Sequence, residues 1–430
     1  MFKFKHFRIG VLYIRIMKTL FADISRLIGI SNAVKFGSAM NQLESLENAY
    51  LLVENGCVLD FGKMENAPES DAIISLGNRE VLPGFVDSHT HTVFAVPREE
   101  EFVMRIKGAS YEEIAEAGGG ILNSARKLRA ISEDELFNRA MERVKKMILN
   151  GTTTLEIKSG YGLSVDAELK MLRVIKRLKA AFPITIRATF LGAHAFPEIF
   201  KERKDDYVEL VIKDMLPTII AEELADHIDV FCENGFFSQE QATKVIQGGR
   251  KYGLPAKIHG NQLGYSGGVQ VAVSNECWSV DHLEFTREEE WNLLLDSFKS
   301  DFGGTLPVAL PGVSYFLGLP YAEGRKMIEK GLPLVLATDF NPGSSPVHSL
   351  QMVMSLACTQ MKLTPEEAFH AITVNAAAAL RLTDSVGSLA KGCRADFLVM
   401  KSENSLAKMP YFVGQNQVES VFVNGEKFIS

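Results

Sequence analysis

The chain has 430 residues, of which 46% are hydrophobic and 23% are charged, and this composition is typical of a folded globular protein. Its formal net charge of −7 at pH 7 argues against general binding to nucleic acid or to anionic membranes, because both need a basic surface. The length is sufficient for one α/β barrel and one small accessory domain.

The first 18 residues are basic and apolar, but Arg15 interrupts their apolar run and no small-residue cleavage site follows. We interpret residues 1–18 as a disordered extension and Met17 as the natural start. No apolar run approaches the roughly 20 residues of a membrane span. The five cysteines lack Cys-x-x-Cys spacing, which predicts reduced thiols and a cytoplasmic protein.

Residues 19–82 are predicted to form short strands and turns, with a hairpin at Asn55-Gly56 inside the apolar stretch 49–59. The pattern then changes to strands that alternate with amphipathic helices. The clearest helix covers residues 133–150, with Ser132 as its cap and Gly151 as its stop. Eight strand-like runs are expected, one ending at His89 and the others at residues 152–158, 184–194, 227–233, 254–259, 279–285, 304–310 and 333–339.

The end of the chain returns to the pattern of its beginning. Residues 387–399 are predicted to form a strand pair, and residues 418–429 a hairpin at Asn424-Gly425. Neither terminal segment has enough apolar surface to be stable alone. The fold class is therefore predicted as α/β, a (β/α)8 TIM-like barrel (residues 83–384) with a small β-sandwich domain built from both chain ends (19–82 and 385–430).

Candidate ligands stand at the ends of the predicted barrel strands. His89 and His91 lie on the same side of an extended segment, because strand residues alternate with period two. Further runs end at His194, His259, His282 and Asp339. The carboxyl ends of barrel strands meet at one face, so these side chains are expected around one mouth.

Three imidazoles and one carboxylate suit a zinc or ferrous iron ion and leave room for water, whose pKa the metal lowers. Asp339 is then a candidate to take the proton of the water, and His282 or His194 to stabilise the oxyanion. The run ending at Glu233 has no lysine that could bridge two metals as a carbamate, which favours a mononuclear site. We expect Lys158 to be a charge partner rather than a ligand.

Loops near the mouth contain groups suited to a small anionic substrate. Arg98 offers a bidentate fork for a carboxylate, although a single loop arginine is often a solvated charge. Tyr161 offers a phenol, and Asn341, Gly343 and Ser344 offer polar groups. The run Gly118–Gly120 lacks the lysine of a phosphate-binding loop, and we interpret it as a flexible loop at a helix start.

On these motifs the chain resembles the metal-dependent amidohydrolases and, within that superfamily, the imidazolonepropionase family. The motifs that carry the resemblance are residues 83–91, 156–162, 190–194, 229–233, 280–283 and 337–344. Lys-Ser-Gly-Tyr-Gly and Thr-Asp-Phe-Asn-Pro-Gly-Ser are the more specific of them.

The resemblance implies hydrolysis of 4-imidazolone-5-propanoate to N-formimidoyl-L-glutamate, a step of histidine degradation, with one zinc or iron ion. It implies that His89, His91, His259 and Asp339 hold the metal, and that Arg98, Tyr161, His194, Asn341, Gly343 and Ser344 bind substrate. Gln262 stands where some relatives carry glutamate, so it joins Asp339, His282 and His194 as a catalytic candidate whose role is open. We also expect a homodimer.

Three other interpretations remain open from the sequence. The first is a sister amidohydrolase acting on another small ring, such as a deaminase or a hydantoinase-like enzyme. The second is an inactive barrel that serves as an interaction protein, and the third is a metal-storage or metal-sensing module. The presence of every expected ligand disfavours the second. The third would leave Arg98 and Tyr161 without a role.

Overall fold

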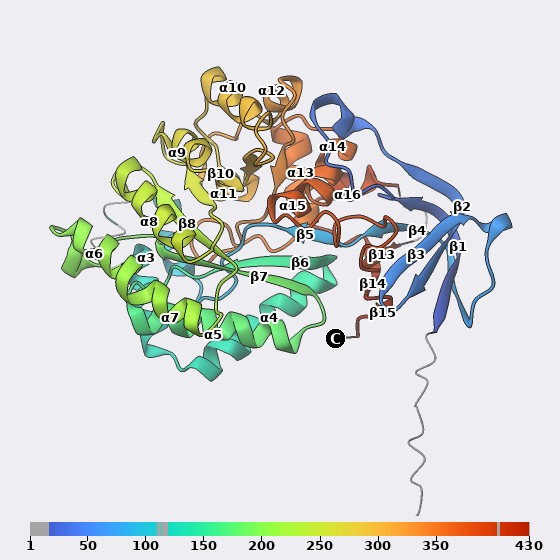
Figure 1. The fold of residues 1–430 in the computed structure, drawn as a ribbon, viewed down its shortest axis with the longest axis horizontal. Helices are drawn as coiled ribbons and strands as arrows, with labels where there is room; N and C mark the ends of the chain where they lie inside the picture. The colour runs from blue at the N-terminus through green and yellow to red at the C-terminus, as the bar shows by residue number, and fades with distance from the viewer. Residues whose placement is uncertain (1–16, 110–112, 114–118, 402–404, 430) are drawn as a thin grey trace, which may run out of the picture.

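The computed structural model describes residues 17–109, 113, 119–401 and 405–429, and it contains a barrel and a separate sheet beside it. In Figure 1 the blue strands from the start of the chain and the red strands from its end lie together on the right. The predicted extension lies outside the described residues except for its last two, and Lys18 already belongs to a strand. Gly118 of the predicted glycine loop also lies outside them, and Gly120 begins a helix.

Eight parallel strands form the barrel, in the order in which they occur along the chain. They are β5 (Phe85–Asp87), β6 (Thr152–Lys158), β7 (Thr185–Ala193), β8 (His227–Cys232), β9 (Ile258–Gly260), β10 (Ser279–His282), β11 (Leu306–Ala309) and β12 (Val335–Leu336). This arrangement confirms the predicted fold class. Several strands are shorter than predicted at one or both ends; β9, for example, begins at Ile258 and β12 covers only Val335 and Leu336.

The barrel closes where its first and last strands end. Thr90 and Phe340 form a parallel bridge, and the Asp339 N–H donates to the His89 carbonyl at 3.0 Å. The His91 N–H donates to the Phe340 carbonyl at 2.9 Å. Residues about 250 positions apart in the sequence are thereby held side by side.

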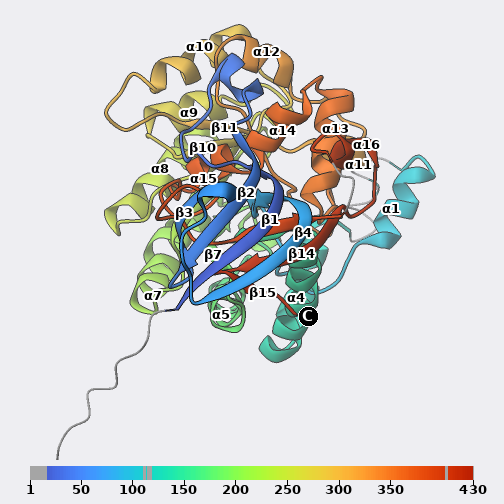
Figure 2. The ribbon, with the colours of Figure 1, turned by 90° about the vertical axis from the view of Figure 1, so that its right-hand side faces the viewer.

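Helices surround the barrel strands in both ribbon views (Figures 1 and 2). They are α1 (Glu99–Ile106), α3 (Gly120–Ala130), α4 (Glu133–Leu149), α5 (Val165–Ala181), α6 (Lys204–Leu210), α7 (Leu216–Ala221), α8 (Gln239–Lys251), α9 (Gly268–Ser274), α10 (Glu288–Ser297), α11 (Pro311–Leu317), α12 (Gly324–Glu329), α13 (Leu350–Gln360), α14 (Pro365–Ala371), α15 (Val374–Ala379) and α16 (Lys408–Tyr411). Shorter helical turns are η1 (Gly37–Asn41), η2 (Met64–Asn66), η3 (Glu198–Phe200) and η4 (Val211–Met215).

Helix α4 illustrates why these segments are helical. Its cap Ser132 accepts the Glu135 N–H, as predicted, which satisfies one of the free donors of the first turn. Leu136, Ala140 and Val144 recur at four-residue spacing and are fully buried against the barrel. None of the helices in the described part of the chain is both long and apolar enough to cross a membrane.

The second unit is a seven-stranded mixed sheet in the order β15-β14-β13-β4-β1-β2-β3. Its strands are β1 (Lys18–Ile28), β2 (Ser45–Glu54), β3 (Cys57–Lys63), β4 (Ala72–Pro83), β13 (Phe397–Met400), β14 (Val418–Val423) and β15 (Glu426–Lys427). Figure 2 looks onto this sheet, with the barrel behind it. Both predicted Asn-Gly hairpins are present, with both residues of each turn in the left-handed region.

This sheet folds over on itself, so its two halves enclose a core. The rings of Phe21 in β1 and Phe422 in β14 are only 5.5 Å apart, although β4 and β13 separate their strands. Register shifts interrupt β1, and Asp23, Asn48 and Asn78 on three neighbouring strands take positive φ. Such irregularities increase local bending, which lets a single sheet resemble a sandwich.

The predicted strand pair at residues 387–399 is wrong in its first half, since only Phe397–Met400 forms a strand there. Residues just before Phe397 instead form backbone hydrogen bonds with the hairpin of β2 and β3. The Val58 N–H donates to the Cys393 carbonyl and the Ala395 N–H to the Gly56 carbonyl, both at 2.8 Å. Their backbone groups are therefore already paired with that hairpin and do not form a second strand of their own.

Candidate metal centre and active site

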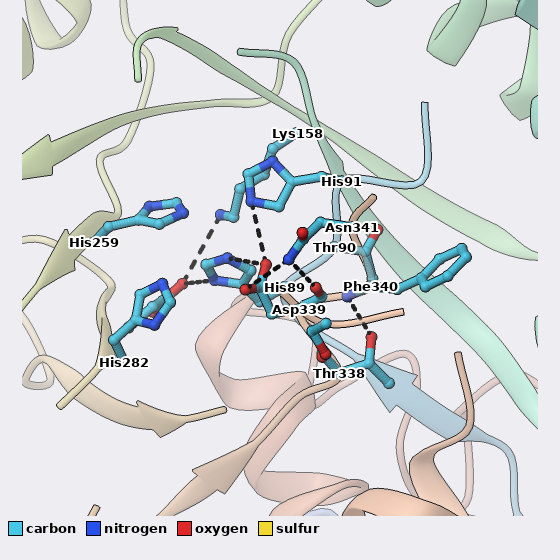
Figure 3. Close-up of polar contacts among 12 residues, drawn as sticks. His89, Thr90, His91, Lys158, His259, His282, Thr338, Asp339, Phe340 and Asn341 are labelled. Atoms are coloured by element: carbon cyan, nitrogen blue, oxygen red, sulfur yellow. Dashed lines mark hydrogen bonds and ion pairs between the residues drawn. The ribbon is translucent and has the colours of Figure 1, made fainter. Parts of the chain in front are cut away.

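Six predicted site residues gather at the carboxyl ends of the barrel strands. His89 and His91 follow β5, and His194 follows β7. His259 lies in β9, His282 ends β10, and Asp339 follows β12. All six are buried. Figure 3 shows His89 and His91 facing Asp339, with His259 and His282 approaching from the neighbouring strands.

The nitrogens of these imidazoles have distinct surroundings. His89 Nδ1 lies 2.6 Å from Asp281 Oδ2, and His259 Nδ1 lies 3.1 Å from Asp229 Oδ1. A carboxylate oxygen accepts a hydrogen bond, so Nδ1 carries the proton and the lone pair of each neutral ring is on Nε2. The Nε2 atoms of His89 and His259 have no hydrogen-bond partner among the described residues. Oriented imidazoles with a free Nε2 are the usual form of histidine ligands in metal sites.

Asp339 completes the cluster. Its Oδ1 lies 3.4 Å from His89 Nε2 and 3.3 Å from His91 Nε2, and it too lacks a hydrogen bond within the described part of the chain. Potential ligand atoms lie within 4.8 Å of one another in two groups, His89 with His91 and Asp339, and His89 with His259 and His282. These nitrogen and oxygen donors fit a zinc or iron ion. His282, which we did not predict as a ligand, lies close to the same centre.

Burial and neighbouring charges keep the imidazoles of His89 and His91 neutral. Burial, with Lys158 beside His89 and His194 beside His91, holds both pKa values well below the usual value. Neutral imidazole is the form that binds metal. Burial raises the pKa of Asp339 to about 7, against the opposing influence of His282 and Asn341. Burial also disfavours protonated His282, but Glu284 and Asp339 outweigh it and the pKa rises.

A buried ionic network lies beneath the histidines. Lys158 Nζ lies 2.7 Å from both Glu156 Oε1 and Asp229 Oδ2, and 3.8 Å from Asp281 Oδ2. Lys257 Nζ lies 3.7 Å from Asp281 Oδ2. All five side chains have no exposed surface. Asp229 and Asp281 therefore link the two lysines to His259 and His89, and Lys158 is the charge partner we expected.

Arg98 is half-buried, and its Nε lies 3.6 Å from Oε2 of the buried Glu101, so it is not a solvated charge. Its side chain is 11% exposed, and its Nε has no hydrogen-bond partner among the described residues. The backbone N–H of Arg98 donates to the Pro342 carbonyl at 3.2 Å. A Cβ on Gly343 would lie 1.2 Å from Arg98 Nη2, so any side chain there would displace the guanidinium. The guanidinium thus lies against the loop that follows Asp339.

Tyr161 and His194 both lie beside His91. The ring of His194 stacks on His91 at 5.3 Å, and the ring of Tyr161 lies 5.7 Å from His91. His194 Nδ1 is 3.0 Å from the Gly160 carbonyl, which can only accept, so this nitrogen carries the proton. Burial lowers the pKa of His194 to about 4, and the neutral ring therefore presents Nε2 as an acceptor.

Asn341 shapes the loop that follows Asp339. Its Nδ2 lies 3.0 Å from Asp339 Oδ2 and 2.8 Å from Ser344 Oγ. Its Oδ1 accepts the N–H groups of Gly343 and Ser344 at 2.8 and 2.7 Å. The amide of Asn341 thus bonds to Asp339 and to its own loop, and the expected contact of Asn341 with substrate stays a prediction.

Gln262 lies in the loop after β9, beside the carboxylate of Glu233, which we did not predict as a site residue. Glu233 Oε2 accepts the N–H groups of Gln262 and Leu263, both at 2.9 Å. Asp229, Asp281 and Glu284 were likewise not predicted as site residues. Their only sequence signal is a carboxylate near the end of a barrel strand, which is common, and their partners come from strands distant in sequence.

A family model described as the amidohydrolase family matches residues 81–292 and 321–427. A curated imidazolonepropionase of Flavobacterium johnsoniae is 48% identical over 95% of this chain and 100% of its own length. Another, of Geobacillus kaustophilus, is 39% identical over 96% and 99%.

Solved structures extend the likeness of the fold. A triazine hydrolase variant superposes with a TM-score of 0.73 at 16% identity, covering 96% of this chain and 95% of its own. A guanine deaminase from C. acetobutylicum superposes with a TM-score of 0.69 at 18% identity, covering 96% and 100%. At such low identity these two structures show the fold alone.

Proposed function

Because this chain belongs to the amidohydrolase family, and within it to the imidazolonepropionases, we propose that it hydrolyses 4-imidazolone-5-propanoate to N-formimidoyl-L-glutamate in histidine degradation. The observation that carries the proposal is the convergence of His89 Nε2 and His91 Nε2 on Asp339 Oδ1, in a chain that spans its relatives over their full length. The chain is therefore a hydrolase of a small molecule.

We assign His89, His91, His259 and Asp339 as ligands of one zinc or iron ion. The support is that Nε2 of His89 and of His259 and Oδ1 of Asp339 have no hydrogen-bond partner in the described part of the chain. When bound, such an ion supplies a Lewis acid that lowers the pKa of water toward neutrality. Asp229 and Asp281 would fix the orientation of the His259 and His89 rings by accepting hydrogen bonds from their Nδ1–H groups.

The chain's own residues supply the remaining steps. Water attacks the ring carbonyl carbon, Asp339 takes its proton, and the C–N bond breaks as that proton passes to the ring nitrogen. His282 stabilises the oxyanion as a donor, because its neighbours Glu284 and Asp339 favour the protonated ring. His194 suits this role less well, since its proton is committed to the Gly160 carbonyl.

We assign the propionate of the substrate to Arg98. A guanidinium held against Gly343 and largely removed from water can bind a carboxylate in a bidentate manner. Tyr161 and His194, which lie beside His91, would form the wall against which the ring rests. Gln262, Gly343 and Ser344 stay candidates for contacts with the ring, since they lie in the loops around the mouth.

The test is release of N-formimidoyl-L-glutamate from imidazolonepropanoate by the purified protein. A sister amidohydrolase would leave this substrate intact and convert another small ring, and an inactive barrel would convert neither. Metal analysis on the same sample would identify zinc or iron. We infer a homodimer in the cytoplasm; the free thiols of all five cysteines support that compartment.

A further inference from the structure

Glu284 is a buried carboxylate without a hydrogen bond. Its side chain is 1% exposed, and neither Oε1 nor Oε2 has a hydrogen-bond partner in the part of the chain that the structure describes. Its nearest charged neighbour there is His282, whose Nδ1 lies 3.5 Å from Oε1 and also lacks a hydrogen bond. Buried polar groups are nearly always hydrogen-bonded, so a carboxylate whose one neighbour in this part of the chain is an imidazole at 3.5 Å requires an explanation.

Two other buried carboxylates near the mouth, Glu168 and Glu233, are hydrogen-bonded to backbone groups. Glu168 accepts the N–H groups of Gly160, Gly162 and Leu163. Glu233 accepts the N–H groups of Asn234, Gln262 and Leu263. These two residues hold loops in place. Glu284 accepts no backbone N–H group from the residues that the structure describes, so its carboxylate is available to a ligand.

The backbone around Glu284 is fixed toward the metal centre. His282 and Leu283 both take positive φ, of 93° and 68°, which is rare for residues other than glycine and turns the chain sharply at the end of β10. The N–H groups of Leu283 and Phe285 donate to the carbonyls of Gly260 and Asn261 at 3.3 and 2.9 Å. Glu284 is thereby held beside the loop after β9, next to the histidines.

We propose that Glu284 binds substrate, accepting a hydrogen bond from an N–H group of the five-membered ring while His282 faces the ring carbonyl. The proposal rests on the proposed function, because it takes imidazolonepropanoate as the ligand. Arg98 would hold the propionate and Glu284 the ring, so that the two contacts fix the ring in one orientation. A ring without this N–H group would leave the Glu284 carboxylate buried and unpaired, which gives the site a preference for cyclic amides and amidines.

The test compares Glu284→Gln and Glu284→Leu with the wild type in the metal-loaded enzyme. Glu290→Gln is the matched control, because Glu290 is as buried as Glu284 but caps α10 through the Arg287 N–H. The readouts are the Kd of the product N-formimidoyl-L-glutamate by calorimetry, KM and kcat for the substrate, and metal content. Because hydrogen bonds to charged groups are stronger than neutral ones, we expect Glu284→Leu to raise the product Kd about 10- to 100-fold and Glu284→Gln less.

Metal content should stay at the wild-type level in both variants, and Glu290→Gln should bind product as the wild type does. Wild-type values of Kd and KM in Glu284→Leu would overturn the proposal, even if kcat falls. That result would mean that Glu284 acts only through His282 and does not bind the substrate. A wild-type enzyme that neither converts the substrate nor binds the product would instead overturn the proposed function. The two failures are therefore distinct.

Discussion

Replacing Lys158 with methionine tests the buried network that orients the histidines. Methionine keeps much of the apolar stem but removes the ammonium group, which has three carboxylates within 4 Å, at 2.7, 2.7 and 3.8 Å. Removing one partner of a fully buried ion pair costs about 3–5 kcal/mol, because the other charge is left uncompensated. Lys257 remains 3.7 Å from Asp281 and offsets part of the loss there, but Glu156 and Asp229 lose their close cation. We therefore expect the free energy of unfolding to fall by about 3–5 kcal/mol.

Arg177→Met is the matched control. Arg177 also has two acidic partners, Glu133 at 3.0 Å and Asp134 at 2.9 Å, but its side chain is 37% exposed. Exposed pairs contribute roughly 0–1 kcal/mol, so this variant should unfold almost as the wild type does. Urea denaturation followed by tryptophan fluorescence suits both, because Trp278 and Trp291, the two tryptophans of the chain, lie in the barrel.

The pH dependence of this deficit follows from the charge of Lys158. Burial lowers its pKa, but attraction by Asp229, Glu156 and Asp281 outweighs burial and raises it above the ordinary 10.5. A raised pKa gives stability that is complete below the unfolded pKa and is lost only as pH rises through the folded one. The deficit of Lys158→Met should thus be constant between about pH 7 and pH 9. A loss no larger than that of Arg177→Met, or one that disappears within this range, would refute the argument.

Three further predictions concern the metal, the substrate and the chain ends. Chelation should abolish activity and zinc or iron should restore it, while His259→Ala should lose metal and activity together; two metals per chain by elemental analysis would contradict the mononuclear assignment. Arg98→Met should lower kcat/KM by a factor that corresponds to about 2–4 kcal/mol, with metal content unchanged. Gly343→Ala should also lower kcat/KM, because its Cβ displaces the Arg98 guanidinium. Unaltered kinetics would place the carboxylate site elsewhere. Deleting residues 397–429 removes β13, β14 and β15 and should destabilise the N-terminal strands, which limited proteolysis would detect as earlier cleavage before Pro83.

The sequence alone determined the order of the strands and the main members of the site. Period-two alternation places His89 and His91 on one side of a segment, and parallel barrel strands end at one face. Together these two rules place Asp339 and His259 beside that pair. The Asn-Gly hairpins and the cap of α4 were also predictable, because their signals are local.

Only the tertiary structure decided how each side chain is used. Asn341 bonds to Asp339 and to its own loop, and Lys158 lies close to three carboxylates. Among the described residues, His282 is the one charged group found within 4 Å of Glu284. The same residue types in the same strand positions are compatible with other pairings. The physical reason is that these contacts join strands separated by up to 192 residues, as between His89 and Asp281, and depend on barrel closure to within about an ångström. Sequence patterns fix which face a residue occupies, while the packed barrel fixes which atom it meets there.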